Sequence, residues 1–284
     1  MYYEKLNRNA VWMCLFALLG FVGFNFTSKV EQIALTPSIN INQYLASMPF
    51  VYLAPLNLYL QQPSSTILVF ALGLVTINVG IVYLRHTAFI TKWLGINFVF
   101  WGLGAIVAGI SYQAFGADLK CALYESCRFT HWVELFYMTL TVISINALLI
   151  AYSAFHSPRT SIRLQILALL SVFMYTLLQG LGMILSVKFL LTYEFMLIFL
   201  SINFLILMWT DYAQRHIFIH KRLFIWWCVF LVVNLAYFVA LFSAYAKPLY
   251  QQTGIWFNEN DVLHILLLLW MLGWITWTKP KMLK

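Results

Sequence analysis

Charged side chains are scarce in this chain of 284 residues. Asp, Glu, Lys and Arg make up 9% of it, against 63% hydrophobic residues. A soluble protein of this length needs many more charges to hydrate its surface, so a soluble globular domain is excluded. The net charge of +8 does not indicate a nucleic-acid partner, because Lys and Arg occur singly or in small groups beside apolar segments and form no extended basic face.

Sequence signatures of common enzymes are also missing. The chain has no Gly-rich phosphate loop, nucleophile elbow, His-Glu-x-x-His zinc motif or cysteine redox pair, so no reaction is assigned by a motif. It also lacks a clear internal repeat and matched Gly or Pro breaks in corresponding helices, which transporters often show. Such repeats can be weak, so transport stays open.

Long apolar stretches are what the chain does have. Each is apolar around its whole circumference, which suits lipid surroundings, and most approach the roughly 20 residues that cross about 30 Å of hydrocarbon. We therefore predict an all-α polytopic membrane bundle, with an N-terminal anchor or signal helix followed by seven transmembrane helices, and membrane lipid as a partner. The eight stretches are residues 10–26, 64–84, 93–115, 133–155, 164–186, 189–209, 223–246 and 259–277.

Basic residues fall unequally on the two sides when the connecting segments are assigned alternately. With the N-terminus inside, 12 of the 17 Lys and Arg residues are cytoplasmic and 5 are external, whereas most Asp and Glu lie at or near the outer face. Because this bias sets orientation, we expect both termini to be cytoplasmic, in a bacterial inner membrane or an endomembrane. The external five are Lys29, Lys120, Arg128, Lys188 and Lys247.

Two segments near the N-terminus need separate interpretation. Residues 44–60 are apolar enough to span, but Pro49 and Pro55 would disrupt a helix interior, and a span here would put most basic residues outside. We therefore expect residues 1–26 to be an anchor or signal helix, 27–63 an outer-face segment and 64–284 the seven-helix membrane domain. The residues after the first stretch lack a clear cleavage site, which favours a retained anchor over a cleaved secretory signal.

Cysteine spacing suggests one disulfide. Cys121 and Cys127 lie in a single short outer loop, which faces an oxidising compartment on the predicted topology. A Cys121–Cys127 bond is plausible there, and two free or buried thiols are the alternative. A zinc knuckle is not expected, because no second cysteine pair completes four ligands.

Polar residues gather at the predicted outer helix ends. The last stretch begins with Asn260, Asp261 and His264, which helical spacing places beside one another; the stretch 93–115 ends with Ser111, Tyr112 and Gln113, and the next begins at Glu134. Ionisable groups at membrane depth are costly, so such a cluster indicates a functional site. The plainer alternative is that these residues cap the helices or are hydrated at their ends.

These features resemble the superfamily of alkaline ceramidases, adiponectin-receptor-type proteins and GPI-remodelling phospholipases. The resemblance implies seven helices and a zinc-dependent lipid amidase or esterase site built from three histidines and an aspartate. By position, Gln113 and Asn260 stand where two of those histidines belong, His264 at the third, and Val133 or Glu134 near the aspartate. Carboxamides are weak zinc ligands, so the alternative zinc set is His264, Asp261 and Glu134 with one open position for water.

Three classes of function follow. A hydrolase-like protein, catalytic through His264, Asp261 and Glu134 or decayed to a binding role, predicts an outward cavity that also joins Gln113, Asn260, Ser111 and Tyr112. A small-solute transporter or channel predicts a polar path near mid-membrane. A structural or sensing membrane protein predicts neither. The residues of the predicted polar path are Asn146, Gln179, Asn203 and Asn234.

Overall fold

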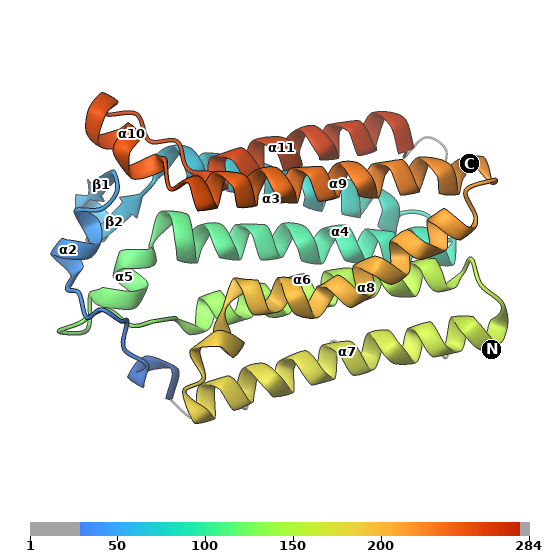
Figure 1. The fold of residues 1–284 in the computed structure, drawn as a ribbon, viewed down its shortest axis with the longest axis horizontal. Helices are drawn as coiled ribbons and strands as arrows, with labels where there is room; N and C mark the ends of the chain where they lie inside the picture. Colours follow the sequence, from blue (N-terminus) through green and yellow to red (C-terminus); the bar gives the residue numbers. More distant parts are fainter. Residues whose placement is uncertain (1–28, 279–284) are drawn as a thin grey trace.

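A computed structural model describes residues 29–278, and the predicted anchor or signal helix at 10–26 lies outside them. Its α-helices run lengthwise through the molecule (Figure 1), as expected for an all-α membrane bundle. Six are long and apolar enough to cross a membrane: α3 (Pro63–Leu84), α4 (Phe89–Ala108) with the π-helical turn Gly109–Ala114, α6 (Trp132–Ser153), α7 (Pro158–Leu185), α8 (Tyr193–Ala213) and α9 (Phe218–Ser243).

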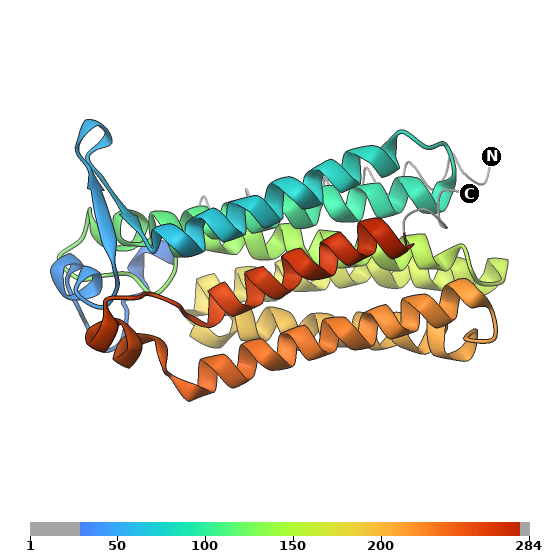
Figure 2. The same ribbon diagram turned by 90° about the horizontal axis from the view of Figure 1, so that it is seen from above.

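The last predicted stretch is shorter as a helix. α11 (Glu259–Gly273) continues as the π-helical turn Trp274–Thr278, and it lies alongside the six long helices (Figure 2). Its α-helical part is 15 residues long, less than the roughly 20 residues of a full span. By length and composition, six helices of the described residues are therefore candidate spans, and α11 is not among them.

Six of these helices form a closed ring. Contacts run from α3 to α4, then to α6, α8, α9 and α11, and from α11 back to α3. α7 lies outside the ring and packs against α6, whose side chains are mostly buried. The ring therefore encloses a space, and α6 is its best covered wall.

Paired glycines bring α3 and α4 into close contact. A Cβ at Gly80 would lie 2.8 Å from the carbonyl oxygen of Gly95, and one at Gly95 would lie 2.9 Å from that of Gly80. About two helical turns away, Gly73 and Gly102 approach each other in the same way, each Cβ position lying close to the carbonyl oxygen of the other glycine. Small residues are what allow membrane helices to approach this closely.

Amides in the apolar stretches mostly join helices. The Asn203 side chain on α8 donates to Asn146 on α6 (3.0 Å) and to Ser171 on α7 (3.1 Å), and Gln179 on α7 donates to the Leu135 carbonyl on α6 (3.1 Å). Ser144 on α6 donates to Asn97 on α4 (2.9 Å). A buried polar group without a partner is costly in lipid, and these bonds remove that cost while they tie α7 to the ring.

The segment before α3 folds over one end of the bundle and does not form a long helix. It contains the 3-10 turn Lys29–Gln32, α2 (Ile41–Leu45), and the antiparallel strands β1 (Phe50–Leu53) and β2 (Leu58–Gln61) joined by a 3-10 turn at Ala54–Leu56. α2 carries a capping box in which Asn40 and Gln43 bond each other's backbone. Pro49 and Pro55 thus lie at the start and in the turn of a hairpin.

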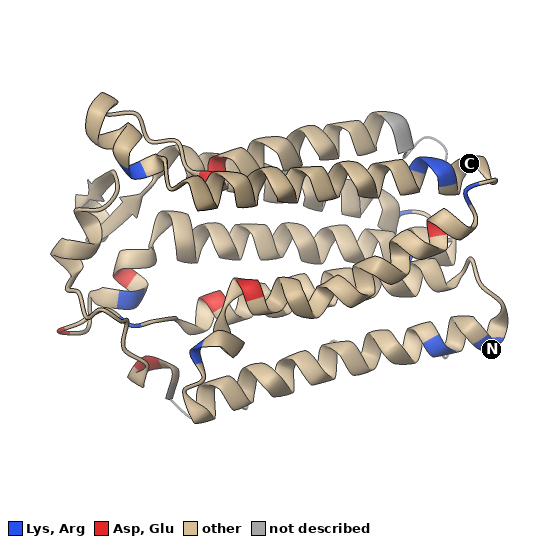
Figure 3. Cartoon of the chain, in the orientation of Figure 1, with Lys and Arg blue, Asp and Glu red and all other residues tan. Residues whose placement is uncertain are grey.

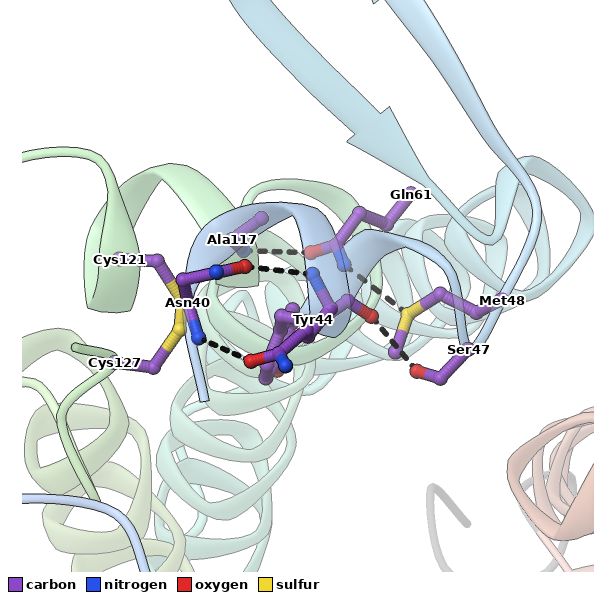
Figure 4. The surroundings of a disulfide bond; sticks show 9 residues. Asn40, Tyr44, Ser47, Met48, Gln61, Ala117, Cys121 and Cys127 are labelled. Carbon is purple, nitrogen blue, oxygen red and sulfur yellow. Dashed lines mark hydrogen bonds between the residues drawn. A yellow bond between two sulfur atoms is a disulfide. The ribbon is translucent and has the colours of Figure 1, made fainter. Parts of the chain in front are cut away.

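A disulfide joins Cys121 and Cys127 beneath this segment (Figure 4). Cys121 ends the short helix α5 (Gly116–Cys121), and the backbone of Cys127 bonds Ile39 (2.8 Å) and Leu35 (3.0 Å). From the hairpin, the Gln61 side chain accepts a hydrogen bond from the Ala117 amide (2.7 Å; Figure 4). The outer-face segment, α5 and the disulfide loop therefore form one connected cap.

Charges separate between the two ends of the bundle. Acidic residues concentrate at the end that carries the hairpin, and basic residues dominate the opposite end (Figure 3). At that opposite end, Asp211 is the one acidic residue in the described chain. The capped end is the predicted outer face. α10 (Ala246–Thr253) and the 3-10 turn Lys188–Leu191 also lie there.

Candidate functional site: a cavity inside the helix ring

The ring encloses a cavity of about 750 Å³. Its walls come from α3, α4, α6, α8, α9 and α11, whereas no residue of α7 lines it. On α6 the lining runs from Glu134 to Leu148, and 14 residues of helix measure about 21 Å. The cavity is thus long as well as large, and its volume lies within the range of about 300–1,000 Å³ usual for ligand sites.

The depth of the cavity is apolar and largely aromatic. Phe98 and Trp101 of α4, Phe230 of α9 and Trp270 of α11 line it, and their rings contact one another, with the Trp101 and Trp270 centroids 5.8 Å apart. At the far end, the Trp274 indole donates to the Tyr83 hydroxyl (3.2 Å). Such a lining suits a hydrocarbon chain, because it offers apolar surface and few unpaired polar atoms.

An ion pair lies at the capped end of the cavity. Lys120 at the end of α5 pairs with Glu134 in the first turn of α6, and both side chains are buried. The Thr130 hydroxyl donates to the second carboxylate oxygen (2.8 Å). Burial alone would lower the pKa of Lys120, but the charge of Glu134, the influence of Tyr44 and the hydrogen bond to Glu134 together outweigh burial and hold that pKa above its usual value. Lys120 and Glu134 therefore pair as charged groups. Tyr44 on α2 lies close to them, and burial raises the pKa of its hydroxyl.

Local structure explains how these groups meet. The disulfide closes the loop between α5 and α6, and the Arg128 amide bonds the Lys120 carbonyl (2.9 Å), so Lys120 is folded back onto Glu134. His131 caps α6, its Nδ1 accepting a bond from the Val133 amide (3.3 Å). Burial lowers the pKa of His131, which favours the neutral ring that this bond requires.

Two buried side chains in the cavity wall have a polar atom without a hydrogen-bond partner. They are Gln113 Oε1, in the π-helical turn after α4, and His264 Nδ1, in the second turn of α11. Gln113 is 4% exposed and His264 7%, and both line the cavity. Orphaned buried polar atoms are rare in folded proteins, and each calls for an explanation.

Two carboxylates at the mouth also lack partners. Glu194 in the first turn of α8 and Glu259 in the first turn of α11 line the cavity, and within residues 29–278 neither side chain forms a hydrogen bond or an ion pair. Four tyrosines stand beside them as two edge-to-face pairs. Tyr112 and Tyr137 have centroids 5.7 Å apart, and Tyr193 and Tyr237 6.3 Å apart.

The predicted site residues are only partly brought together. Gln113, Tyr112, Glu134, Asn260 and His264 all line the one cavity, as the hydrolase-like interpretation expects. Two others do not. Ser111 donates to its own helix, to the carbonyls of Val107 and Ala108, and Asp261 completes the cap of α11 with Asn258 (2.9 and 3.0 Å).

The predicted zinc set is not assembled. Across the described part of the chain, no three His, Cys, Asp or Glu side chains converge so as to hold a metal ion. Glu134 is occupied by Lys120 and Thr130, and Asp261 caps its own helix. His264, Asp261 and Glu134 therefore do not fit a zinc ion in this arrangement.

The predicted transport path is not continuous. Asn146, Gln179 and Asn203 bond one another's helices and do not line the cavity, whereas Asn234 does line it. The Asn234 amide donates to the Phe230 carbonyl of its own helix (2.8 Å). The amides serve mainly as links between helices.

A second polar cluster lies near the opposite end of the bundle. His220 is 2% exposed, and its Nδ1 lies 2.6 Å from Asp211 Oδ1. The Tyr152 hydroxyl (2.8 Å) and the Trp227 indole (2.9 Å) both donate to Asp211 Oδ2. This cluster ties α6, α8 and α9 together below the cavity. Its signal in the sequence was Asp211, because Asp211 and Glu4 are the two acidic residues on the predicted cytoplasmic side.

The comparisons with known proteins add no assignment. No protein-family model, no curated protein and no solved structure matches this chain. What the chain does must therefore be argued from the cavity itself.

Proposed function

We propose that this multi-pass membrane protein binds a lipid or similar amphiphile in its cavity, with the polar head at the capped end and the chain among the aromatic residues. The observation that carries the proposal is the cavity's division into a polar mouth and an apolar depth. A small polar solute would leave the depth unsatisfied, and a pure hydrocarbon would leave the mouth without partners.

The proposal includes a topology. The capped end is external, both termini are cytoplasmic, and α11 with its π-helical turn is a seventh span of 20 residues from Glu259 to Thr278. The charge difference between the ends supports this orientation. The resemblance to the hydrolase superfamily is kept as a proposal about architecture, and the bound amphiphile is held without zinc chemistry.

The experiment is to fill the cavity without disturbing the outside of the bundle. Ala108 on α4 lines the cavity, so Ala108→Phe places a ring inside it. Leu103 on the same helix is 39% exposed and does not line the cavity, so Leu103→Phe is the matched control. Both variants and the parent are purified in a nonionic detergent, and the retained amphiphile is measured by mass spectrometry of the intact complexes.

We expect the parent and Leu103→Phe to retain an amphiphile and Ala108→Phe to lose most of it while it still unfolds cooperatively. Retention by Ala108→Phe equal to that of the parent would place the lipid on the outer surface. A parent protein that carries none and takes up none of an added C12 alcohol would remove the proposal.

A further inference from the structure

We propose that the cavity selects an amphiphile whose head is a positively charged nitrogen that carries N–H donors, such as a long-chain alkylammonium. This inference rests on the proposed function and specifies its ligand class. It is drawn from the charges, the unpartnered acceptors and the aromatic faces at the mouth.

The charges that line the cavity sum to a negative value. They are Lys120 on one side and Glu134, Glu194 and Glu259 on the other, one positive against three negative, which leaves −2. Lys120 is already neutralised by Glu134. Glu194 and Glu259 have no ion-pair partner in the described chain, so two acidic side chains are left at the mouth, where they favour a cation over a carboxylate or a phosphate.

Helix N-termini at the mouth offer little to an anion. α6, α8 and α11 all begin there, and free N-termini of helices would favour a negative group. Each of them already has its own cap: His131 on α6, Thr192 on α8 and Asn258 on α11. These caps satisfy amides at the helix N-termini, so little is left there for an anion to bind.

The two unpartnered atoms of the cavity wall, Gln113 Oε1 and His264 Nδ1, favour a ligand with hydrogen-bond donors. Gln113 Oε1 can only accept, and the free Nδ1 of His264 accepts in the tautomer that carries its proton on Nε2. An alkylammonium head carries three N–H donors and no acceptor, so it matches acceptors of this kind and is attracted by carboxylates. Glu194 and Glu259 lie in the first turns of α8 and α11, where acidic residues stabilise a helix. That position does not account for the two buried, unpartnered atoms of Gln113 and His264 in the same cavity.

Tyrosine rings at the mouth also favour a cationic head group. Tyr112, Tyr137, Tyr193 and Tyr237 all line the cavity near these carboxylates, and aromatic faces attract cations. One such contact already exists, since the Lys120 ammonium lies 5.1 Å from the centroid of the Tyr112 ring. The mouth therefore combines free carboxylates, unpartnered acceptors and aromatic faces around one volume.

The test compares amphiphiles that share one C12 chain and differ only in the head: dodecylamine, dodecanol, dodecanoate and dodecyltrimethylammonium. Binding to the purified full-length protein is measured at pH 7, where the amine is charged, by the change in tryptophan fluorescence and by thermal stabilisation. We expect dodecylamine to bind about tenfold or more tighter than dodecanoate, a difference of ~1.4 kcal/mol or more. Dodecyltrimethylammonium, which lacks N–H donors, should fall between them.

The double variant Glu194→Gln/Glu259→Gln should lose most of the preference for dodecylamine and keep its affinity for dodecanol, which also shows that the cavity is intact. Glu125→Gln is the matched control, because Glu125 is an exposed acid in the disulfide loop that does not line the cavity. If all four amphiphiles bind alike, or dodecanoate binds tightest, the head-group inference is wrong and amphiphile binding stands. If none binds, the proposed function itself fails.

Discussion

At the scale of single residues, the ion pair of Lys120 and Glu134 best shows what the sequence contained and what it concealed. Glu134 could be selected because it opens an apolar stretch, whereas Lys120 looked like an ordinary loop lysine. The pair forms because the disulfide loop folds α5 back onto α6. Sequence spacing of 14 residues across an irregular loop gives no geometric prediction, so the partner could not be foreseen.

Lys120→Met should strongly destabilise the protein, because it leaves the buried Glu134 carboxylate without its counter-charge. Breaking one side of a buried pair costs about 3–5 kcal/mol, whereas replacing both partners with apolar residues is often close to neutral. We therefore expect Lys120→Met/Glu134→Leu to recover much of the loss. Equilibrium unfolding in detergent, followed by circular dichroism, measures the free energy of unfolding for the cycle.

Lys247→Met serves as the control, since Lys247 is an exposed lysine at the same end of the bundle. It should change the free energy of unfolding by less than about 0.5 kcal/mol. A Lys120→Met variant as stable as Lys247→Met would mean that the pair contributes nothing to the fold.

At the scale of elements, the sequence predicted helices well and their ends less well. The stretch 189–209 forms α8 from Tyr193 to Ala213, because Lys188–Leu191 is a 3-10 turn and Thr192 caps the helix through the Phe195 amide (3.2 Å). Hydropathy counts Phe189 and Leu190 as part of a span, because it measures only how apolar residues are. It does not detect that Thr192 caps the helix and so sets where α8 begins.

The π-helical turn at Gly109–Ala114 was a further gap in the prediction. It holds Gln113, one of the two unpartnered acceptors of the cavity. Turns of this kind often occur at functional sites, but they have no sequence signature, since they arise from packing around them. The sequence therefore placed Gln113 at the correct helix end without its orientation.

Close packing of α3 against α4 gives a prediction at this scale. Gly80→Leu should destabilise the bundle, because a Cβ there would lie 2.8 Å from both the Gly95 carbonyl oxygen and the Val99 amide nitrogen. Backbone atoms cannot move aside as a flexible side chain can, so the two helices must separate. Overpacking typically costs about 1–3 kcal/mol, and thermal unfolding should show a lower midpoint.

Asn78→Leu is the matched control on the same helix. Asn78 is exposed, and its side chain bonds only the Leu74 carbonyl of its own helix (2.8 Å), so an added leucine there meets lipid instead of backbone. Equal midpoints for Gly80→Leu and Asn78→Leu would contradict the close approach of α3 and α4.

At the scale of the whole molecule, the proposed binding of an amphiphile depends on which side of the membrane the capped end of the ring faces. The ring, the cavity and the separation of charge all have a direction, and a ligand that enters at the capped end meets the free carboxylates first. Hydropathy predicted the long apolar helices, and the charge pattern gives a sidedness that stays a prediction. They could not predict that six helices close into a ring and leave α7 outside, because nearly uniform apolar surfaces carry no signal about which neighbour each one meets.

Sidedness gives the last prediction, which is tested with single cysteines and a membrane-impermeant maleimide on intact cells. Cys14 and Cys228 are first replaced by alanine, and Cys121 and Cys127 stay joined as a disulfide. Gln252→Cys, exposed at the end of α10, should label in intact cells. Ser157→Cys, exposed between α6 and α7, and a cysteine added after Lys284 should label only after lysis, because the basic end is retained in the cytoplasm.

Labelling of Ser157→Cys in intact cells would mean that the orientation is inverted and that Glu194 and Glu259 face the cytosol. Labelling of the added cysteine alone would leave that orientation intact and show that α11 does not cross.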